Sequence, residues 1–172
     1  DDLSVGEKYS VILTTGAGFA RYALEDQIEV VAPNAIEFVG KSNHTSDICG
    51  EKLTESFVSK ILEKASSRFQ LRGLVMLAPE WDQPPRYFLF SESDQTTAAA
   101  AFVEEQLRSS VHYNYCRRLG QLAPVEGHRV TRANERYLQG CETLGQRVGN
   151  VKPAYLRREF GWRERLGERD AG

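Results

Sequence analysis

The pattern of apolar residues changes at Gly40, and this change constrains the fold more than any other feature of the sequence. Before it, three segments rich in β-branched and apolar residues read as short strands: Tyr9 to Thr15, Arg21 to Val31 and Ile36 to Val39. The first is apolar almost throughout, which is typical of a strand covered on both faces, and Glu25 and Asp26 interrupt the second. Three short strands with little helix to cover them would be marginally stable alone.

After Gly40 a polar loop leads into helical periodicity. Phe57, Ile61, Leu62 and Ala65 recur at helical spacing and predict a helix of about four turns that begins near Thr54. A proline-bearing turn between segments 74–77 and 87–90 predicts a hairpin, and segments 97–109 and 134–144 read as helices around a short strand at 127–131. Segment 112–122 is either helical or an irregular connection. This order predicts an α+β fold with a ferredoxin-like unit.

Composition and charge exclude several classes of protein. The chain has 172 residues, 41% of them hydrophobic, and a net charge of 22 − 24 = −2. These values are ordinary for a globular protein. The segment from Arg157 to Arg169 is locally basic, but its interleaved glutamates favour a solvated helix face. The N-terminus resembles no signal peptide, and no apolar run approaches membrane-spanning length. We therefore expect a cytoplasmic protein that binds neither nucleic acid nor membrane.

The cysteines and histidines show no catalytic or metal-binding pattern. Cys49, Cys116 and Cys141 are odd in number and far apart, so we expect three free thiols, two of them buried. The three histidines, at positions 44, 112 and 128, lack the spacing of a metal site or a nucleophile partner, and surface or structural roles are expected for them. The sequence therefore predicts no metal site.

A carboxylate, a glycine joint and a cation follow one another within a short path: Asp26, Gly40 and Lys52. A nucleotide site closed by a mobile domain needs these three features. On the residues alone, a turn carboxylate between strands is the favoured interpretation of Asp26, and Lys52 can be a solvated lysine in the first turn of the following helix. Tyr22 lies in the same stretch, and from the residues alone we expect it to be a core residue.

Five segments carry a resemblance to a known family. GFARYALED, FVGKSN and GEKLTE, in this order, resemble segments of the auxin-responsive (Gretchen Hagen) family of acyl-acid amido synthetases, and HYNYCRRLGQL and GQRVGNVKP resemble the C-terminal domain of its bacterial members. The resemblance extends from about Tyr9 to Pro153. It implies an adenylate-forming ligase that uses ATP and Mg²⁺ to convert a carboxylic acid to an acyl-adenylate and then passes the acyl group to an amino acid.

The resemblance also implies roles for residues near the N-terminus. Asp26 corresponds to the aspartate that binds the ribose hydroxyls, and Lys52 to a lysine that contacts the nucleotide. Arg21 and Tyr22 match the first motif and are assigned to nucleotide binding with them. Glu25 departs from the pattern, because the family has glycine there.

A second set of roles concerns movement and catalysis. Lys152 corresponds to the catalytic lysine that meets the α-phosphate and the substrate carboxylate, although the usual K-x-P-R is here K-P. Gly40 and Lys41 correspond to the hinge. It is equally possible that Lys152 is an ordinary loop lysine before a proline, with no functional role.

The resemblance implies two parts: residues 1–39 as a β-strand remnant of a large adenylation domain, and residues 40–172 as a C-terminal α+β lid domain. The phosphate-binding loop and acyl pocket are expected in the missing large domain, through which the carboxylic acid and the amino acid would bind, so the fragment alone is expected to be inactive. Exposed N-terminal strands can drive self-association. Two alternatives remain: the lid of an acyl-CoA ligase of the phenylacetate type, and a non-catalytic α+β protein-binding module.

Overall fold

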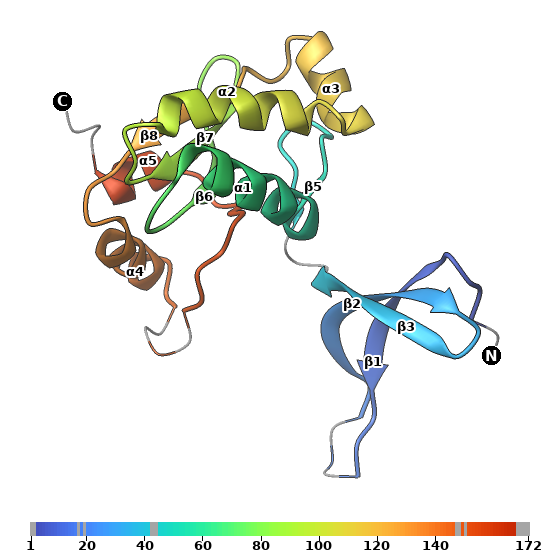
Figure 1. Cartoon of the computed structure of the whole chain (residues 1–172). Coiled ribbons are helices and arrows are strands. Elements are labelled where there is room, and N and C mark those ends of the chain that lie inside the picture. The colour runs from blue at the N-terminus through green and yellow to red at the C-terminus, as the bar shows by residue number, and fades with distance from the viewer. Residues whose placement is uncertain are drawn as a thin grey trace. The chain divides into compact units, whose positions relative to one another are not determined.

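The computed structural model describes residues 3–16, 18, 20–41, 45–146, 149 and 151–167, with the side chains of residues 23–25, 40 and 41 excepted. The chain divides into two compact units, residues 1–44 (unit 1) and 45–172 (unit 2) (Figure 1). Each unit is described by itself. Within the described part of the chain, no helix is both long and apolar enough to cross a membrane.

Unit 1 is a three-stranded antiparallel sheet. Its strands are β1 (Lys8–Leu13), β2 (Tyr22–Ala32) and β3 (Ala35–Lys41), in the order β1-β2-β3. These are the three strands that the sequence predicts, and a two-residue turn, Pro33 and Asn34, joins the last two. Proline and asparagine favour such a turn through the fixed φ of one and the local hydrogen bonding of the other.

Both pairings of β2 are irregular in its first half. Ser10 pairs with Gln27 and Ile12 with Ala23, so that residues 24–26 of β2 oppose the single residue Val11. On the other side the register shifts between Gln27 and Ile28. The predicted interruption at residues 25 and 26 is therefore a bulge in a continuous strand, because the ladder resumes at Gln27.

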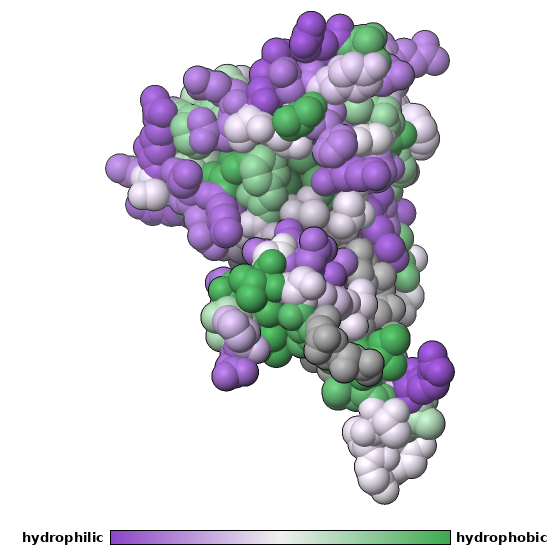
Figure 2. Space-filling view, turned by 90° about the vertical axis from the view of Figure 1, so that its right-hand side faces the viewer, coloured by the Kyte–Doolittle hydropathy of each residue, from purple (hydrophilic) through white to green (hydrophobic). Residues whose placement is uncertain are grey.

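The apolar side chains of unit 1 are largely exposed, and Figure 2 shows hydrophobic residues at the molecular surface. The expectation that β1 is covered on both faces is wrong, since Ile12 is 57% exposed and no helix of the described residues belongs to this unit. Among the described side chains of unit 1, the buried hydrophobic residue is Val30. A small sheet whose apolar side chains are largely exposed has little core of its own.

Unit 2 begins with two short paired strands, β4 (Thr45–Ser46) and β5 (Leu53–Thr54), followed by α1 (Glu55–Phe69). The Thr54 side chain caps α1 by accepting a hydrogen bond from the Phe57 N–H at 3.4 Å, as the sequence predicts. The buried face of the helix consists of Val58, Ile61, Leu62 and Ala65. Gln70 ends it in the left-handed conformation, with φ of 51°.

A mixed sheet forms the middle of unit 2. Strands β6 (Met76–Glu80) and β7 (Arg86–Ser91) are antiparallel, and β8 (Glu126–Arg129) lies parallel to β7. The connection between β7 and β8 contains α2 (Thr96–Leu107) and α3 (Val111–Arg118). Two helices follow, α4 (Ala133–Thr143) and α5 (Trp162–Leu166). The predicted α+β class is confirmed.

Helices cover both faces of this sheet, and the alternation along β7 shows how (Figure 1). Tyr87 and Leu89 point into a core shared with α1 and α2. Phe88 and Phe90 point into a second core that contains Trp162 and residues of α4. A strand buried on both faces must be apolar throughout, which is why RYFLFS lacks the alternation of a half-exposed strand.

Candidate functional site

Asp26 lies in the bulged stretch of β2, paired with Lys41 of β3. Its side chain is half-buried. Bulges redirect side chains and are over-represented beside active sites, so the backbone here suits a carboxylate with a specific task. The side chain of Glu25, the residue that departs from the family pattern, lies outside the described residues.

Arg21 and Tyr22 stand at the beginning of β2. Arg21 has a positive φ of 52°, and its backbone N–H donates to Thr14 Oγ1 at 3.1 Å. Tyr22 pairs with Leu13 and is 54% exposed, so its interpretation as a core residue is wrong in this unit. Both side chains are exposed, and their assignment to nucleotide binding stays a prediction.

The proposed hinge residues are the last two residues of β3. Gly40 pairs with Gln27 and Lys41 with Asp26, so their backbones belong to the sheet of unit 1. Their side-chain surroundings, and residues 42–44, lie outside the described part of the chain. The hinge role stays a prediction.

Lys52 lies at the end of the turn between β4 and β5 and is exposed. Its neighbours on both sides, Glu51 and Leu53, are each 0% exposed. Lys52 precedes the helix cap Thr54 by two residues, so the expectation of a lysine in the first helical turn is wrong. Its φ of 47° is costly for a residue with a Cβ, and residues held in this way cluster at functional sites.

Lys152 is exposed and lies in an extended segment whose backbone is anchored. Its carbonyl oxygen accepts a hydrogen bond from the Tyr137 hydroxyl at 2.9 Å. The same hydroxyl accepts a hydrogen bond from buried Arg157, whose guanidinium lies 5.2 Å from the ring centre of Trp162. The segment is therefore fixed by its main chain and leaves the lysine side chain in solvent.

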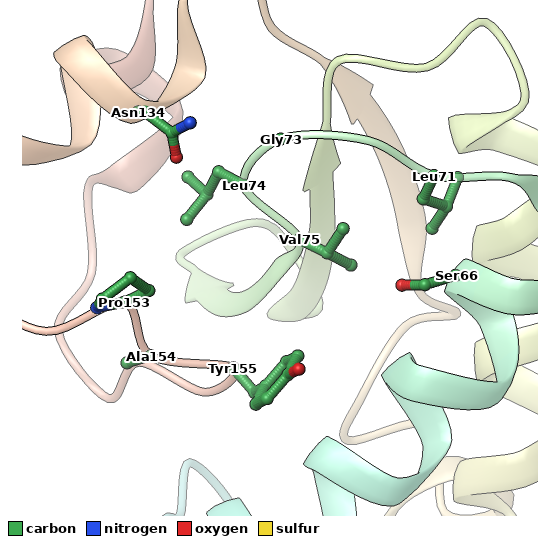
Figure 3. A pocket seen from close by; sticks show the side chains of 9 residues that line it. All are labelled: Ser66, Leu71, Gly73, Leu74, Val75, Asn134, Pro153, Ala154 and Tyr155. Atoms are coloured by element: carbon green, nitrogen blue, oxygen red, sulfur yellow. The ribbon is translucent and has the colours of Figure 1, made fainter.

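A cavity of about 380 Å³ lies beside the Lys152 segment (Figure 3). The three residues that follow the lysine, Pro153, Ala154 and Tyr155, line one side of it. The other sides come from the end of α1, the connection to β6 and the start of α4: Ser66, Leu71, Gly73, Leu74, Val75 and Asn134. The lining combines aliphatic side chains with hydroxyl and amide groups in comparable measure, which suits a small organic group with polar substituents.

A hydrogen bond joins the two lysine segments of unit 2. The backbone N–H of Tyr155 donates to Glu55 Oε1 at 3.3 Å. Lys52 lies three residues before Glu55, and Lys152 three residues before Tyr155. The fold thus brings together the neighbourhoods of two predicted site residues that are 100 positions apart in the sequence.

A side-chain cluster that the sequence did not predict includes two residues of the loop that ends at Lys52. Cys49 Sγ, a carboxylate oxygen of Glu51 and Cys116 Sγ all lie within 4.8 Å of one another. Burial, a hydrogen bond with Cys116 and the charge of Glu51 all raise the pKa of the Cys49 thiol above its usual value. The only signal in the sequence was the short spacing of Cys49 and Glu51, since Cys116 comes from another element.

The other cysteine and histidine expectations have mixed outcomes. All three cysteines are free, and Cys116 and Cys141 are buried, as predicted. His128 is buried, and its Nε2 lies 3.0 Å from the Gly167 carbonyl oxygen, so its role is structural. His112 is exposed, and His44 lies outside the described residues.

Comparisons with known proteins agree with this picture. Residues 1–41 match the model of the GH3 family central domain. A solved structure of the GH3.15 acyl acid amido synthetase is similar to the chain, with a TM-score of 0.71, 19% identity, and coverage of 96% of this chain and 32% of that one. The same enzyme in complex with 2,4-DB gives a TM-score of 0.71 and 18% identity over 91% of this chain and 32% of that one. No curated protein sequence matches the chain.

These findings confirm the resemblance that the sequence motifs indicate. At such identities the similarity to the solved structures establishes the fold, and the family match over residues 1–41 adds sequence evidence for the N-terminal part. The chain spans about a third (32%) of the length of each of these two solved structures.

Proposed function

Because residues 1–41 match the GH3 family central domain and the chain shares its fold with an acyl acid amido synthetase, we propose that it is the C-terminal part of an ATP-dependent acyl-acid amido synthetase. A carboxylic acid and ATP would give an acyl-adenylate and pyrophosphate, and the amine of an amino acid would then displace AMP to form an amide. The observation that carries the proposal is the likeness of fold over 96% of the chain.

Asp26 is proposed to bind the ribose of ATP. A ribose diol presents two O–H donors, and a carboxylate that accepts them forms charge-assisted hydrogen bonds, which are stronger than neutral ones. The half-buried position of Asp26 in a bulge supports this role, since partial burial limits competition from water. Arg21 and Tyr22, both exposed at the start of the same strand, would contribute further contacts to the nucleotide.

Lys52 and Lys152 are proposed to supply positive charge during adenylation. The reaction brings an anionic carboxylate against an anionic phosphate, so a positioned cation lowers the barrier where negative charge gathers. Lysine acts here as a compact point charge. The exposure of both side chains on anchored backbones supports these roles, with Lys152 as the catalytic residue and Lys52 as a nucleotide contact.

The proposal also includes Mg²⁺ and a moving domain. Mg²⁺ in nucleotide sites is held largely by phosphate oxygens and water, and we assign no residue of this chain to it. Gly40 and Lys41 are proposed as the hinge, because lid movements of this kind concentrate their dihedral changes in a few residues at the ends of elements.

The test is adenylation by the complete enzyme that contains these residues, measured as acid-dependent exchange between ATP and pyrophosphate. We expect Asp26→Ala, Lys52→Ala and Lys152→Ala each to lower kcat/KM at least about tenfold, through lost charged contacts. Lys64→Ala is the matched control, since Lys64 is an exposed lysine in the middle of α1. Unchanged exchange in all three site variants would contradict the proposed roles.

Two further measurements separate the alternatives. Amide formation with amino acids supports the amido synthetase, whereas thioester formation with coenzyme A would point to an acyl-CoA ligase. The 172-residue chain alone should catalyse no exchange, because it carries about a third of the length of the enzymes it resembles. Robust exchange by this chain would overturn the assignment as a partial enzyme.

A further inference from the structure

Three side chains of types that can bind a metal, from two distant parts of the sequence, meet in unit 2. Cys49 and Glu51 lie in the loop between β4 and β5, and Cys116 lies in α3. Their ligand atoms are all within 4.8 Å of one another. We propose that Cys49, Glu51 and Cys116 form a zinc-binding site, separate from the chemistry proposed for adenylation.

The first argument is the missing positive charge beside Glu51. This carboxylate is 0% exposed and accepts hydrogen bonds from the Ile48 N–H at 2.7 Å and the Tyr87 hydroxyl at 2.6 Å. None of the ion pairs found among the described residues includes it. Buried charges in proteins are generally paired or coordinate a metal, and a divalent cation would supply the charge that is lacking.

The second argument is the donor set. Two sulfur ligands favour soft or borderline ions, and a carboxylate beside them fits zinc, which binds Cys, His and Asp or Glu with tetrahedral geometry. Zinc to sulfur distances of about 2.3 Å place the sulfurs of such a site about 3.8 Å apart. The two sulfurs lie within 4.8 Å of each other and so have to approach by about 1 Å at most, and Cys49 Sγ already lies 3.3 Å from Glu51 Oε2.

The third argument is the support around Glu51. The Tyr87 hydroxyl donates to Oε1 of this carboxylate and also lies 2.7 Å from Ser46 Oγ, while the Cys49 N–H donates to Oε2 at 2.8 Å. Oε2 is thereby directed towards the Cys49 sulfur. Outer contacts that hold a ligand in this way are a regular part of metal sites, and they fix the geometry before the ion arrives.

The site also has an entrance. Cys116 and Glu51 are 2% and 0% exposed, but Cys49 is half-buried, so an ion can reach the cluster from the Cys49 side. Three protein ligands would leave the fourth position to a water molecule. Binding replaces the two thiol protons: one Zn²⁺ and two S–H groups give two zinc–sulfur bonds and two released protons, with no change of oxidation state.

Zinc would join the loop before Lys52 to α3. A hydrogen bond from Cys116 Sγ to the Cys49 carbonyl oxygen at 3.3 Å already links them. Coordination by both sulfurs would replace this weak contact by metal bonds. The turn that ends in the left-handed Lys52 would then be held more firmly.

The test is a titration of the chelator-treated 172-residue chain, kept reduced by a phosphine, with Co²⁺ and then Zn²⁺. We expect one Co²⁺ per chain, with the thiolate-to-cobalt charge-transfer absorption and visible bands of a tetrahedral site, and displacement by one Zn²⁺. Absence of stoichiometric binding by the folded chain would overturn the proposal. A cobalt spectrum without charge-transfer absorption would do so too, because it excludes sulfur ligands.

Variants locate the ion. Cys49→Ser and Cys116→Ser should each weaken Co²⁺ binding at least about 100-fold, and Tyr87→Phe, which removes an outer contact, about 10–100-fold. Cys141→Ser is the matched control, because Cys141 is a buried thiol that contacts Arg157 in the other core. Retention of the charge-transfer band in both site variants, or its loss in Cys141→Ser with native circular dichroism, would refute the assignment.

Discussion

Glu55 Oε1 accepts a hydrogen bond from the backbone N–H of Tyr155 at 3.3 Å, across 100 positions of sequence. Glu55 is the acidic residue in the first turn of α1, so its charge also faces the positive end of the helix. Tyr155 continues into a short parallel bridge, in which Leu156 pairs with Leu77 of β6. One carboxylate thus holds the segment after Lys152 against the helix that follows Lys52.

Replacement of this carboxylate should loosen that segment. Glu55→Ala is expected to lower the free energy of unfolding of unit 2 by about 1 kcal/mol, from one hydrogen bond and one helix-end charge. Both tryptophans, Trp81 and Trp162, lie in unit 2, so their fluorescence in a urea titration reports its unfolding. Glu63→Ala, an exposed change in the same helix, should have little effect. Equal losses in the two variants would argue against the anchoring role.

Glu104 is the centre of another network, which ties α2 to α3 and to the strand that follows. It accepts hydrogen bonds from the Tyr113 hydroxyl at 2.5 Å and from Arg117 Nε at 2.7 Å. Burial raises the pKa of Glu104, but hydrogen bonds from Tyr113, Arg117, the Val125 N–H and Arg108 outweigh it and lower the pKa below 4.5. The ionised form is therefore favoured by the fold.

This network makes the stability of unit 2 depend on pH in the acid range. A carboxylate whose pKa is lower in the folded state stabilises the fold above its unfolded pKa, and the contribution is lost as pH falls through the folded value. We expect Glu104→Gln to cost about 2–3 kcal/mol at pH 7 and progressively less below pH 4.5. Urea unfolding at several pH values measures this difference. Glu105→Gln, its exposed neighbour, is the control, and a Glu104→Gln effect independent of pH would contradict the argument.

Periodicity predicted the regular elements of unit 2 because their apolar faces are covered by their own neighbours. The buried residues of α1 are in part those that its helical spacing indicates, and Thr54 caps it as expected. In unit 1 the same reasoning failed for β1, because an apolar run shows what a strand could bury and not whether a cover is present. Ile12 is 57% exposed for that reason.

The candidate site was less predictable than the fold. The motif residues Asp26, Lys52 and Lys152 could be named from the resemblance, but the conformation of each could not. Lys52 has a left-handed φ between two buried neighbours, and no local pattern in the sequence indicates either feature. Cys49 and Cys116 meet although 67 positions separate them, because α3 packs beside the loop before β5. Contacts of this range depend on tertiary packing.

The conformation of Lys52 leads to a prediction that separates stability from function. Glycine has no Cβ to clash at φ of 47°, so Lys52→Gly should relieve about 1 kcal/mol of strain, offset in part by the greater freedom of glycine in the unfolded chain. We expect unit 2 to unfold at equal or higher urea concentration while adenylation by the complete enzyme falls. Gln70→Gly, at φ of 51° at the end of α1, should match the stability effect without the loss of activity. Loss of activity in both variants would indicate a general disturbance.

The packing of α4 against α5 is tight at Gly140. A Cβ added there would lie 2.8 Å from Cζ3 of Trp162 and 3.4 Å from Cβ of Arg165. Trp162 itself is 0% exposed and stacks on Tyr137 with ring centres 5.3 Å apart, so it has no free space to move into. Glycine is therefore required here by a close approach, despite its low helix propensity.

Gly140→Ala should consequently destabilise unit 2 by about 1 kcal/mol, because an overpacking cost of about 1–3 kcal/mol exceeds the helix-propensity gain of about 1 kcal/mol. In a Trp162→Phe background the smaller ring removes the atom that the new Cβ would meet. Gly140→Ala should then be neutral or stabilising, which gives a coupling of about 1–2 kcal/mol between the two positions. Urea unfolding followed by circular dichroism measures all four proteins on one signal, since two of the four lack Trp162. Additive effects would mean that the cost arises elsewhere in α4 and not from the contact with Trp162.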